Sequence, residues 1–136
     1  MNNIKLGAVF RYKFKLSPED VSAFIRLSGD DNLIHTDAKA ALSSPIKTMC
    51  VPGMLPALMF SRVLGTMFPG HGTIYRFQNL KFPKPVFVGR SYLVLIEVLR
   101  LIPETHSAIF KTQIRDEAKN ILCIDGEAKV THLTAL

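Results

Sequence analysis

The stretch MLPALMFSRVLGTMF, residues Met54–Phe68, decides the fold of this chain. It is apolar almost all round a helix, with a few polar interruptions. Pro56 is tolerated because it falls in the first helical turn after Gly53. A helix of this composition has to be buried, so we expect the rest of the chain to wrap around it.

The sequence after this helix is typical of β-strands. The chain is first broken by Pro69, Gly70 and Gly72. The apolar run from Tyr92 to Leu99 is nearly continuous, as in a central strand that is covered on both faces. We predict four strands, at residues Thr73–Phe82, Ser91–Leu101, His106–Arg115 and Ile121–Leu133.

One further strand and two short helices precede the apolar helix. Apolar and basic residues alternate from Phe10 to Leu16, with the period of a strand that has one wet face. Ser17–Asp20 carries a capping hydroxyl, a proline and two acids, which predict an amphipathic helix ending near Gly29. After a polar loop, Asp37 is positioned to cap a second short helix.

This order of elements predicts an α+β domain in which an antiparallel sheet wraps around one central apolar helix, the architecture of the hot-dog fold. Residues 1–136 show no linker, repeat or low-complexity tract, so we expect a single domain. The remaining apolar surface and an edge strand predict a homodimer.

Composition excludes several classes of protein. A chain of 136 residues that is 48% hydrophobic is neither disordered nor fibrous. The net charge of +6 favours phosphorylated or acidic partners, but there are no basic runs or nucleic-acid-binding motifs, so we expect no nucleic acid partner.

No apolar run is long enough to span a membrane, and the segment Met1–Gly7 resembles no secretion signal. Cys50 and Cys123 form no CxxC pair, so neither a disulfide framework nor a zinc site is predicted. We therefore expect a cytoplasmic protein with no membrane partner.

The polar stretch Ser28–Asp37 is the strongest functional signal. It brings Asp30, Asp31 and His35 into one loop, where a carboxylate and an imidazole can act on one water as general acid and base. A solvated connector made of turns and caps is an open alternative for these residues. The spacing is not that of an EF-hand, and no second histidine lies nearby, so we expect no metal.

Gly53 stands where the buried helix begins. Its backbone N–H can therefore point outward at the positive end of the helix dipole and meet an oxyanion such as a thioester oxygen. The alternative is that Gly53 merely starts the helix without crowding. Cys50 lacks a positioned base in the sequence, so we do not expect a thiol nucleophile.

Several motifs together resemble one known family. The pattern Ser28-Gly29-Asp30-x-Asn32-x-x-His35-x-Asp37 is similar to the hydratase motif of the MaoC-like dehydratase family. The similarity continues through Gly53–Leu55, Pro69–Tyr75 and Phe82–Gly89, in the order found in the (R)-specific enoyl-CoA hydratases of that family.

The resemblance implies a homodimeric hot-dog enzyme that adds water reversibly to trans-2-enoyl-CoA and gives (R)-3-hydroxyacyl-CoA. It implies a catalytic dyad of Asp30 and His35, an oxyanion donor at Gly53, and supporting roles for Asn32 and Ser61. No cofactor is implied beyond the coenzyme A or phosphopantetheine that belongs to the substrate.

The chain departs from the family pattern at two positions. The family usually has proline where this chain has Leu33, and histidine where it has Pro52. Three alternatives to an enoyl-CoA hydratase remain: a 3-hydroxyacyl-carrier-protein dehydratase with an acyl carrier protein as partner, a thioesterase, and a noncatalytic acyl-thioester binding protein. The thioesterase is disfavoured because Met54–Phe68 contains no Asp or Glu.

Overall fold

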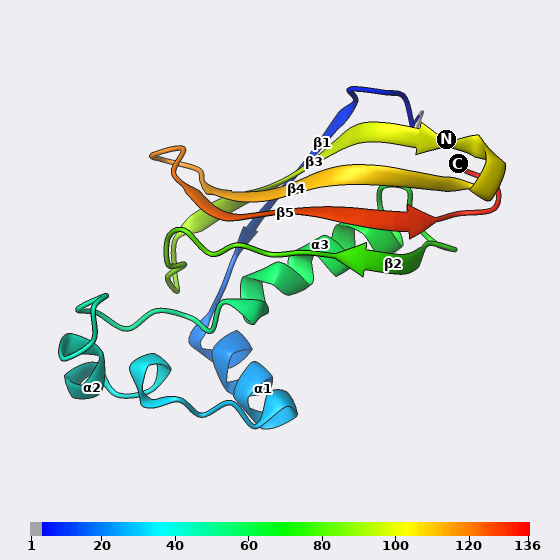
Figure 1. Cartoon of the computed structure of the whole chain (residues 1–136). Helices are drawn as coiled ribbons and strands as arrows, with labels where there is room; N and C mark the ends of the chain where they lie inside the picture. Colours follow the sequence, from blue (N-terminus) through cyan, green and yellow to red (C-terminus); the bar gives the residue numbers. More distant parts are fainter. Residues whose placement is uncertain (1–3) are drawn as a thin grey trace.

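The computed structural model of the chain describes residues 4–136 and contains one antiparallel sheet that curls around a central helix (Figure 1). The strands lie side by side in the order β1-β3-β4-β5-β2. This arrangement confirms the predicted sheet wrapped around an apolar helix. The strands are β1 (Val9–Lys15), β2 (Ile74–Gln78), β3 (Ser91–Ile102), β4 (Ser107–Asp116) and β5 (Leu122–Thr131).

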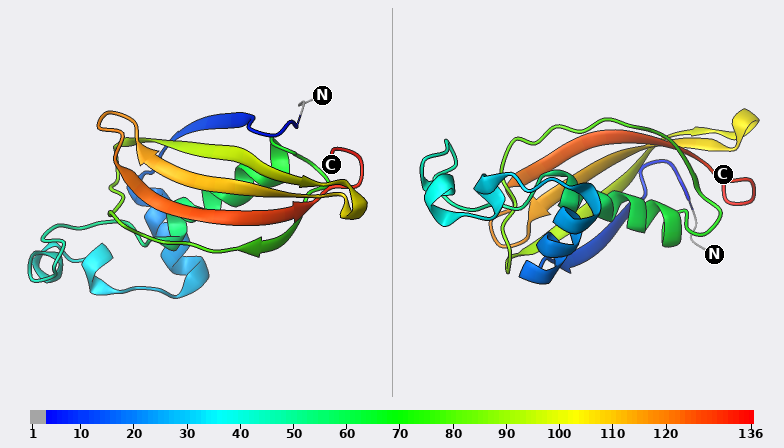
Figure 2. Two further views of the ribbon diagram at one scale, coloured as in Figure 1. Left: turned by 45° about the horizontal axis from the view of Figure 1, so that its top comes forward. Right: turned by 90° about the horizontal axis from the view of Figure 1, so that it is seen from below.

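The helices fall into two groups. The long helix α3 (Met54–Thr66) lies along the inner face of the sheet, whereas the shorter helices project beyond one end of it (Figures 1 and 2). We call this projecting segment, residues 18–49, the overhang. It holds α1 (Pro18–Ser28), the 3-10 turn η1 (Leu33–His35) and α2 (Ala38–Leu42), and a second 3-10 turn, η2 (Pro103–Thr105), joins β3 to β4.

The core forms where α3 meets the sheet. Phe60, Val63 and Leu64 of α3 are at most 1% exposed. They belong to the same hydrophobic cluster as alternate residues of β3 and β4, among them Ile96 and Phe110. Burial of these apolar side chains therefore holds the helix against the sheet and fixes where its first residue, at the edge of the core, can lie.

Local signals place the ends of the overhang helices as predicted. Ser17 caps α1 by accepting a hydrogen bond from the Asp20 N–H, and the Asp20 side chain accepts one from the Ser17 N–H in return. Gly29 ends α1 with a left-handed backbone, φ 74°. The Asp37 carboxylate caps α2 through the N–H groups of Lys39 and Ala40.

Two expectations about burial are wrong for the single chain. In β3 only one face is fully buried, and the side chains of Leu93 and Leu95 on the other face are half-buried, because no second layer covers that face of the sheet. In α3 the outward-facing Met54 and Leu58 are 52% and 47% exposed. The helix therefore carries more apolar surface than one copy of the chain buries.

Strand β2 is also shorter than the predicted Thr73–Phe82. It ends at Gln78, and the chain then bends away while Asn79 and Lys81 still donate backbone hydrogen bonds to β5. Prolines at positions 83 and 85, which cannot donate to a strand, follow at once. The residues that leave the sheet here form one wall of the candidate site.

Residues 1–3, on which part of the expectation about secretion rests, lie outside the described residues. Among residues 4–136, no helix has the length and apolar character needed to cross a membrane.

Candidate active site

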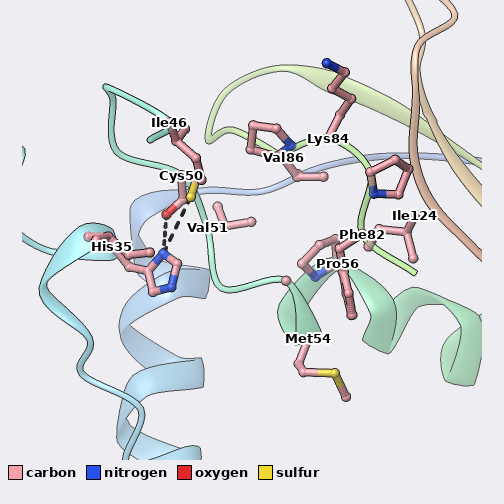
Figure 3. Close-up of a pocket in the computed structure, with 14 residues that line it drawn as sticks. His35, Ile46, Cys50, Val51, Met54, Pro56, Phe82, Lys84, Val86 and Ile124 are labelled. Carbon is pink, nitrogen blue, oxygen red and sulfur yellow. Dashed lines mark hydrogen bonds between the residues drawn. The ribbon is translucent and has the colours of Figure 1, made fainter. Parts of the chain in front are cut away.

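A cavity of about 440 Å³ opens between the overhang, the first turn of α3 and the segment Phe82–Val86 (Figure 3). His35 lies on one side of it, and Phe82, Pro56 and Met54 lie on the other. Most of its lining is apolar, so transfer of an apolar chain from water into the cavity would be favourable. The lining residues are Ile34, His35, Ile46, Cys50, Val51, Gly53, Met54, Pro56, Phe82, Pro83, Lys84, Pro85, Val86 and Ile124.

The imidazole of His35 is fixed by a backbone contact. Its Nδ1 atom lies 2.7 Å from the carbonyl oxygen of Cys50. A carbonyl oxygen can only accept, so Nδ1 carries the proton and donates it to this bond. In the neutral imidazole Nε2 is therefore the unprotonated nitrogen, and it is the atom that can accept a proton.

The first turn of α3 leaves two backbone donors without a protein acceptor among residues 4–136. Gly53, the N-cap residue, supplies no side chain to cap the helix. The Leu55 N–H donates to the Pro52 carbonyl oxygen at 2.9 Å, and Pro56 has no N–H. The N–H groups of Gly53 and Met54 remain, at the positive end of the helix dipole and beside the cavity.

A four-residue segment, 50–53, connects these parts of the site. The Cys50 carbonyl holds His35, the Val51 N–H donates to the Val86 carbonyl oxygen at 2.9 Å, and Gly53 starts α3. One short piece of backbone therefore sets the positions of the histidine, the opposite wall and the helix start relative to one another.

The thiol of Cys50 lies 3.8 Å from His35 Nδ1. Burial raises the pKa of this thiol, while a hydrogen bond to its own backbone acts weakly in the opposite direction. The thiol is therefore protonated at neutral pH. The expectation that no base lies near Cys50 is wrong, because the His35 ring lies beside the thiol, although its Nδ1 atom is committed to the Cys50 carbonyl oxygen.

Of the residues predicted for the site, His35 and Gly53 line the same cavity, and Asp30, Asn32 and Ser61 do not. Asp30 is exposed in the turn after α1, where its carboxylate accepts a hydrogen bond from the Asn32 N–H at 3.3 Å. The Asn32 side chain in turn accepts one from the Ile34 N–H. Ser61 is exposed on the outward face of α3.

The sequence did not single out four features of the cavity. The Cys50 carbonyl and the Met54 N–H are backbone groups that carry no side-chain signal. Phe82 and Lys84 belong to a stretch noted for its similarity to a family, but no pattern assigned them a place near His35. Among the described residues, no cluster of three potential metal ligands occurs.

Comparison with known proteins gives a consistent result. The model of the MaoC like domain matches residues 2–119. The (R)-specific enoyl-CoA hydratase of Rhodospirillum rubrum is 37% identical over 94% of this chain and 88% of its own length. The 3-hydroxybutyryl-CoA dehydratase of Methylorubrum extorquens is 35% identical over 94% of this chain and 80% of its own length.

A mitochondrial 3-hydroxyacyl-[acyl-carrier-protein] dehydratase of Arabidopsis thaliana is 33% identical over 92% of this chain and 75% of its own length. Among solved structures, the (R)-hydratase of Aeromonas caviae superposes with a TM-score of 0.89 at 34% identity, covering 97% of this chain and 99% of that one. The hot-dog fold expected from the sequence is confirmed by this match.

Proposed function

The chain belongs to the MaoC-like dehydratase family and is a hydro-lyase, and from this premise we propose that it hydrates trans-2-enoyl-CoA reversibly to (R)-3-hydroxyacyl-CoA. The observation that carries the proposal is the shared cavity of His35 and the uncapped start of α3. One wall offers a nitrogen that can accept a proton, and the other offers N–H groups for a developing negative charge.

In the proposed mechanism Asp30 and His35 hold one water molecule. The water oxygen bonds to C3 of the enoyl thioester while His35 Nε2 takes up its proton, because Nδ1 is already committed to Cys50. The electron pair of the C2–C3 double bond moves onto the thioester oxygen, which the Gly53 N–H stabilises. The protonated Asp30/His35 pair then returns a proton to C2 as the enolate collapses, which restores the neutral imidazole and releases the 3-hydroxyacyl thioester.

Asp30 enters this mechanism through the loop that it shares with His35. Successive hydrogen bonds from Asn32 N–H to Asp30 and from Ile34 N–H to Asn32 make the loop compact and lead directly into η1. Both side chains lie outside the cavity lining, in the same short loop as His35, and we propose that the Asp30 carboxylate acts on the water and that Asn32 supports it. For Ser61, which is exposed on α3 outside the cavity, we propose a supporting contact.

The substrate supplies the rest of the chemistry. The acyl chain lies against the apolar cavity lining, and the proposed reaction needs no metal and no cofactor beyond the coenzyme A or phosphopantetheine that carries the chain. The excess of basic residues, reflected in the net charge of +6, favours the phosphates of such a carrier. We also propose that the enzyme acts in the cytoplasm.

A second candidate is dehydration of 3-hydroxyacyl-carrier-protein substrates, with an acyl carrier protein as partner. It is favoured by the similarity to the Arabidopsis thaliana dehydratase. The chemistry at His35 and Gly53 would be the same, and only recognition of the carrier would differ. Competition between coenzyme A and carrier-protein thioesters separates the two candidates.

We further propose a homodimer. Strand β2 is an edge of the sheet and exposes Ile74 and Phe77, which are 48% and 54% accessible, beside unpaired backbone groups. The outward face of α3 exposes Met54 and Leu58. A second copy that covers these surfaces would complete the burial that α3 lacks in one chain.

The test is loss of the ultraviolet absorbance of the enoyl thioester when the purified protein meets short and medium trans-2-enoyl-CoA. We expect wild-type turnover, and a loss of about 10²–10⁴-fold in kcat for both Asp30→Asn and His35→Ala. Asp31→Asn is the matched control, because it removes a neighbouring charge in the same loop and is expected to leave kcat unchanged.

No turnover with any coenzyme A or carrier-protein thioester, despite binding of acyl-CoA, would favour the noncatalytic binding protein. Full activity of His35→Ala would contradict the proposed mechanism while leaving the reaction itself in place.

A further inference from the structure

A side chain at residue 53 would collide with the ring of Phe82. The Gly53 backbone has ordinary helical angles, φ −58° and ψ −34°, which any residue adopts. A Cβ atom at this position, however, would lie 2.9 Å from Cδ1 and 3.0 Å from Cε1 of Phe82. The ring of Phe82 therefore occupies the place where a side chain of residue 53 would begin.

The backbone on both sides of Phe82 is held in place. On one side, Lys81 and Asp125 exchange two backbone hydrogen bonds, of 2.7 and 3.0 Å, which tie the segment to β5. On the other side, the Val86 carbonyl oxygen accepts the hydrogen bond from Val51. Prolines at positions 83 and 85 restrict the backbone between these anchors, so a side chain at residue 53 could be accommodated only by rotation of the Phe82 ring out of its observed place.

The ring of Phe82 also faces the cavity. It is 48% exposed, and it lies with Pro56 on the wall opposite His35 (Figure 3). A flat apolar ring beside Gly53 offers a surface to a planar conjugated thioester. A hydrogen bond from Gly53 is stronger where water is excluded.

We propose that Phe82 is a positioning residue: its ring closes one side of the cavity over Gly53, holds the thioester carbonyl at the Gly53 N–H, and is the reason that residue 53 must be glycine. This inference rests on the proposed function. It adds to the site a residue that acts through the placement of substrate and glycine rather than through proton transfer.

A double-mutant cycle of Gly53→Ala and Phe82→Ala tests the coupling, with kcat and KM measured for hydration of crotonyl-CoA. We expect Gly53→Ala to lower kcat about 10²-fold in the wild-type background. In the Phe82→Ala background the same methyl group meets no ring, and we expect it to cost less than about tenfold. Phe82→Ala alone lowers kcat more than it raises KM, and Phe82→Tyr restores the wild-type values.

Gly65→Ala is the matched control, because it adds the same methyl group to α3 at a position where nothing lies within 4 Å. We expect it to leave kcat unchanged. An equal loss for Gly53→Ala in both backgrounds would overturn the inference, and so would a Phe82→Ala variant with wild-type kcat. Phe82→Leu repeats the test with a smaller change if Phe82→Ala folds poorly.

The melting temperature separates a failure of this inference from a failure of the proposed function. Gly53→Ala is expected to lower it, and the double variant to recover part of the loss, whether or not the protein hydrates any thioester. If the wild-type protein is inactive, the inference is supported when the double variant recovers part of the melting temperature and Phe82→Ala binds crotonyl-CoA more weakly than wild type does. Absence of either result overturns it.

Discussion

His35 Nδ1 lies 2.7 Å from the backbone carbonyl oxygen of Cys50, fifteen residues further along the chain. This bond ties the overhang to the segment that leads into α3. It also assigns the protonated nitrogen of the imidazole, because the carbonyl oxygen can only accept. The orientation of the proposed base is thus set by backbone and does not depend on the side chain at position 50.

The first prediction concerns this tautomer. In the neutral state His35 is expected to carry its proton on Nδ1, and nitrogen NMR of labelled protein, assigned with His35→Ala, measures which nitrogen is protonated. Cys50→Ala keeps the carbonyl and is expected to preserve the tautomer. A neutral His35 with its proton on Nε2 would contradict the proposed role of that atom as base.

The second prediction concerns Gly126 in β5. A Cβ atom there would overlap the carbonyl oxygen of Asn79, whose backbone N–H and side chain both bond to Glu127. We expect Gly126→Ala to lower the free energy of unfolding by about 1–3 kcal/mol through overpacking, as measured by chemical denaturation.

The comparison for this variant is Gly65→Ala, which meets no atom within 4 Å and lies in a helix. It is expected to be neutral or to stabilise by up to about 1 kcal/mol, because alanine favours a helix over glycine. If the two substitutions changed the free energy of unfolding equally, the contact with Asn79 would not be what excludes a side chain at residue 126.

The third prediction concerns stability at alkaline pH. Burial raises the pKa of Tyr75 from 10.0 to about 12, and its hydroxyl donates a hydrogen bond to the Gln78 side chain. Between these values the phenol ionises in the unfolded chain but stays neutral in the folded one. The stability that it contributes is therefore complete below about pH 10 and is lost as pH rises toward about 12.

Denaturation midpoints of wild type and Tyr75→Phe, measured from about pH 9, below the lower pKa of 10.0, to about pH 11.5, below the upper pKa of about 12, test this effect. The variant cannot ionise at position 75, so we expect its stability to decline less steeply with pH. Parallel curves for the two proteins would show that Tyr75 titrates alike in both states.

The fourth prediction concerns the proposed homodimer. Phe77→Lys places a charge on the exposed edge strand β2 and is expected to shift the protein from dimer to monomer, as measured by sedimentation or light scattering. Leu133→Lys is the control, since Leu133 is 72% exposed after the end of β5. A wild-type monomer would contradict the homodimer, and a dimer that survives Phe77→Lys would contradict an interface at β2.

The sequence by itself determined the elements whose causes are local. Ser17, Gly29 and Asp37 mark helix ends through hydrogen bonds and backbone angles that involve near neighbours, and the alternation in β1 and β4 follows the pleat of a strand. The apolar run of α3 predicted a central helix because that much apolar surface has to leave water. The polar loop, the start of the apolar helix and the resemblance to a family together predicted His35 and Gly53 as candidates.

The tertiary structure alone decided which of these residues meet. The Cys50 carbonyl and the ring of Phe82 reach the site from segments that are distant in sequence, through backbone bonds and close packing that leave no periodic pattern. The exposed faces of β3 and α3 likewise depend on what packs over them. Burial is a property of the assembled layers, so an apolar stretch predicts that a surface will be covered but not by which part of the molecule.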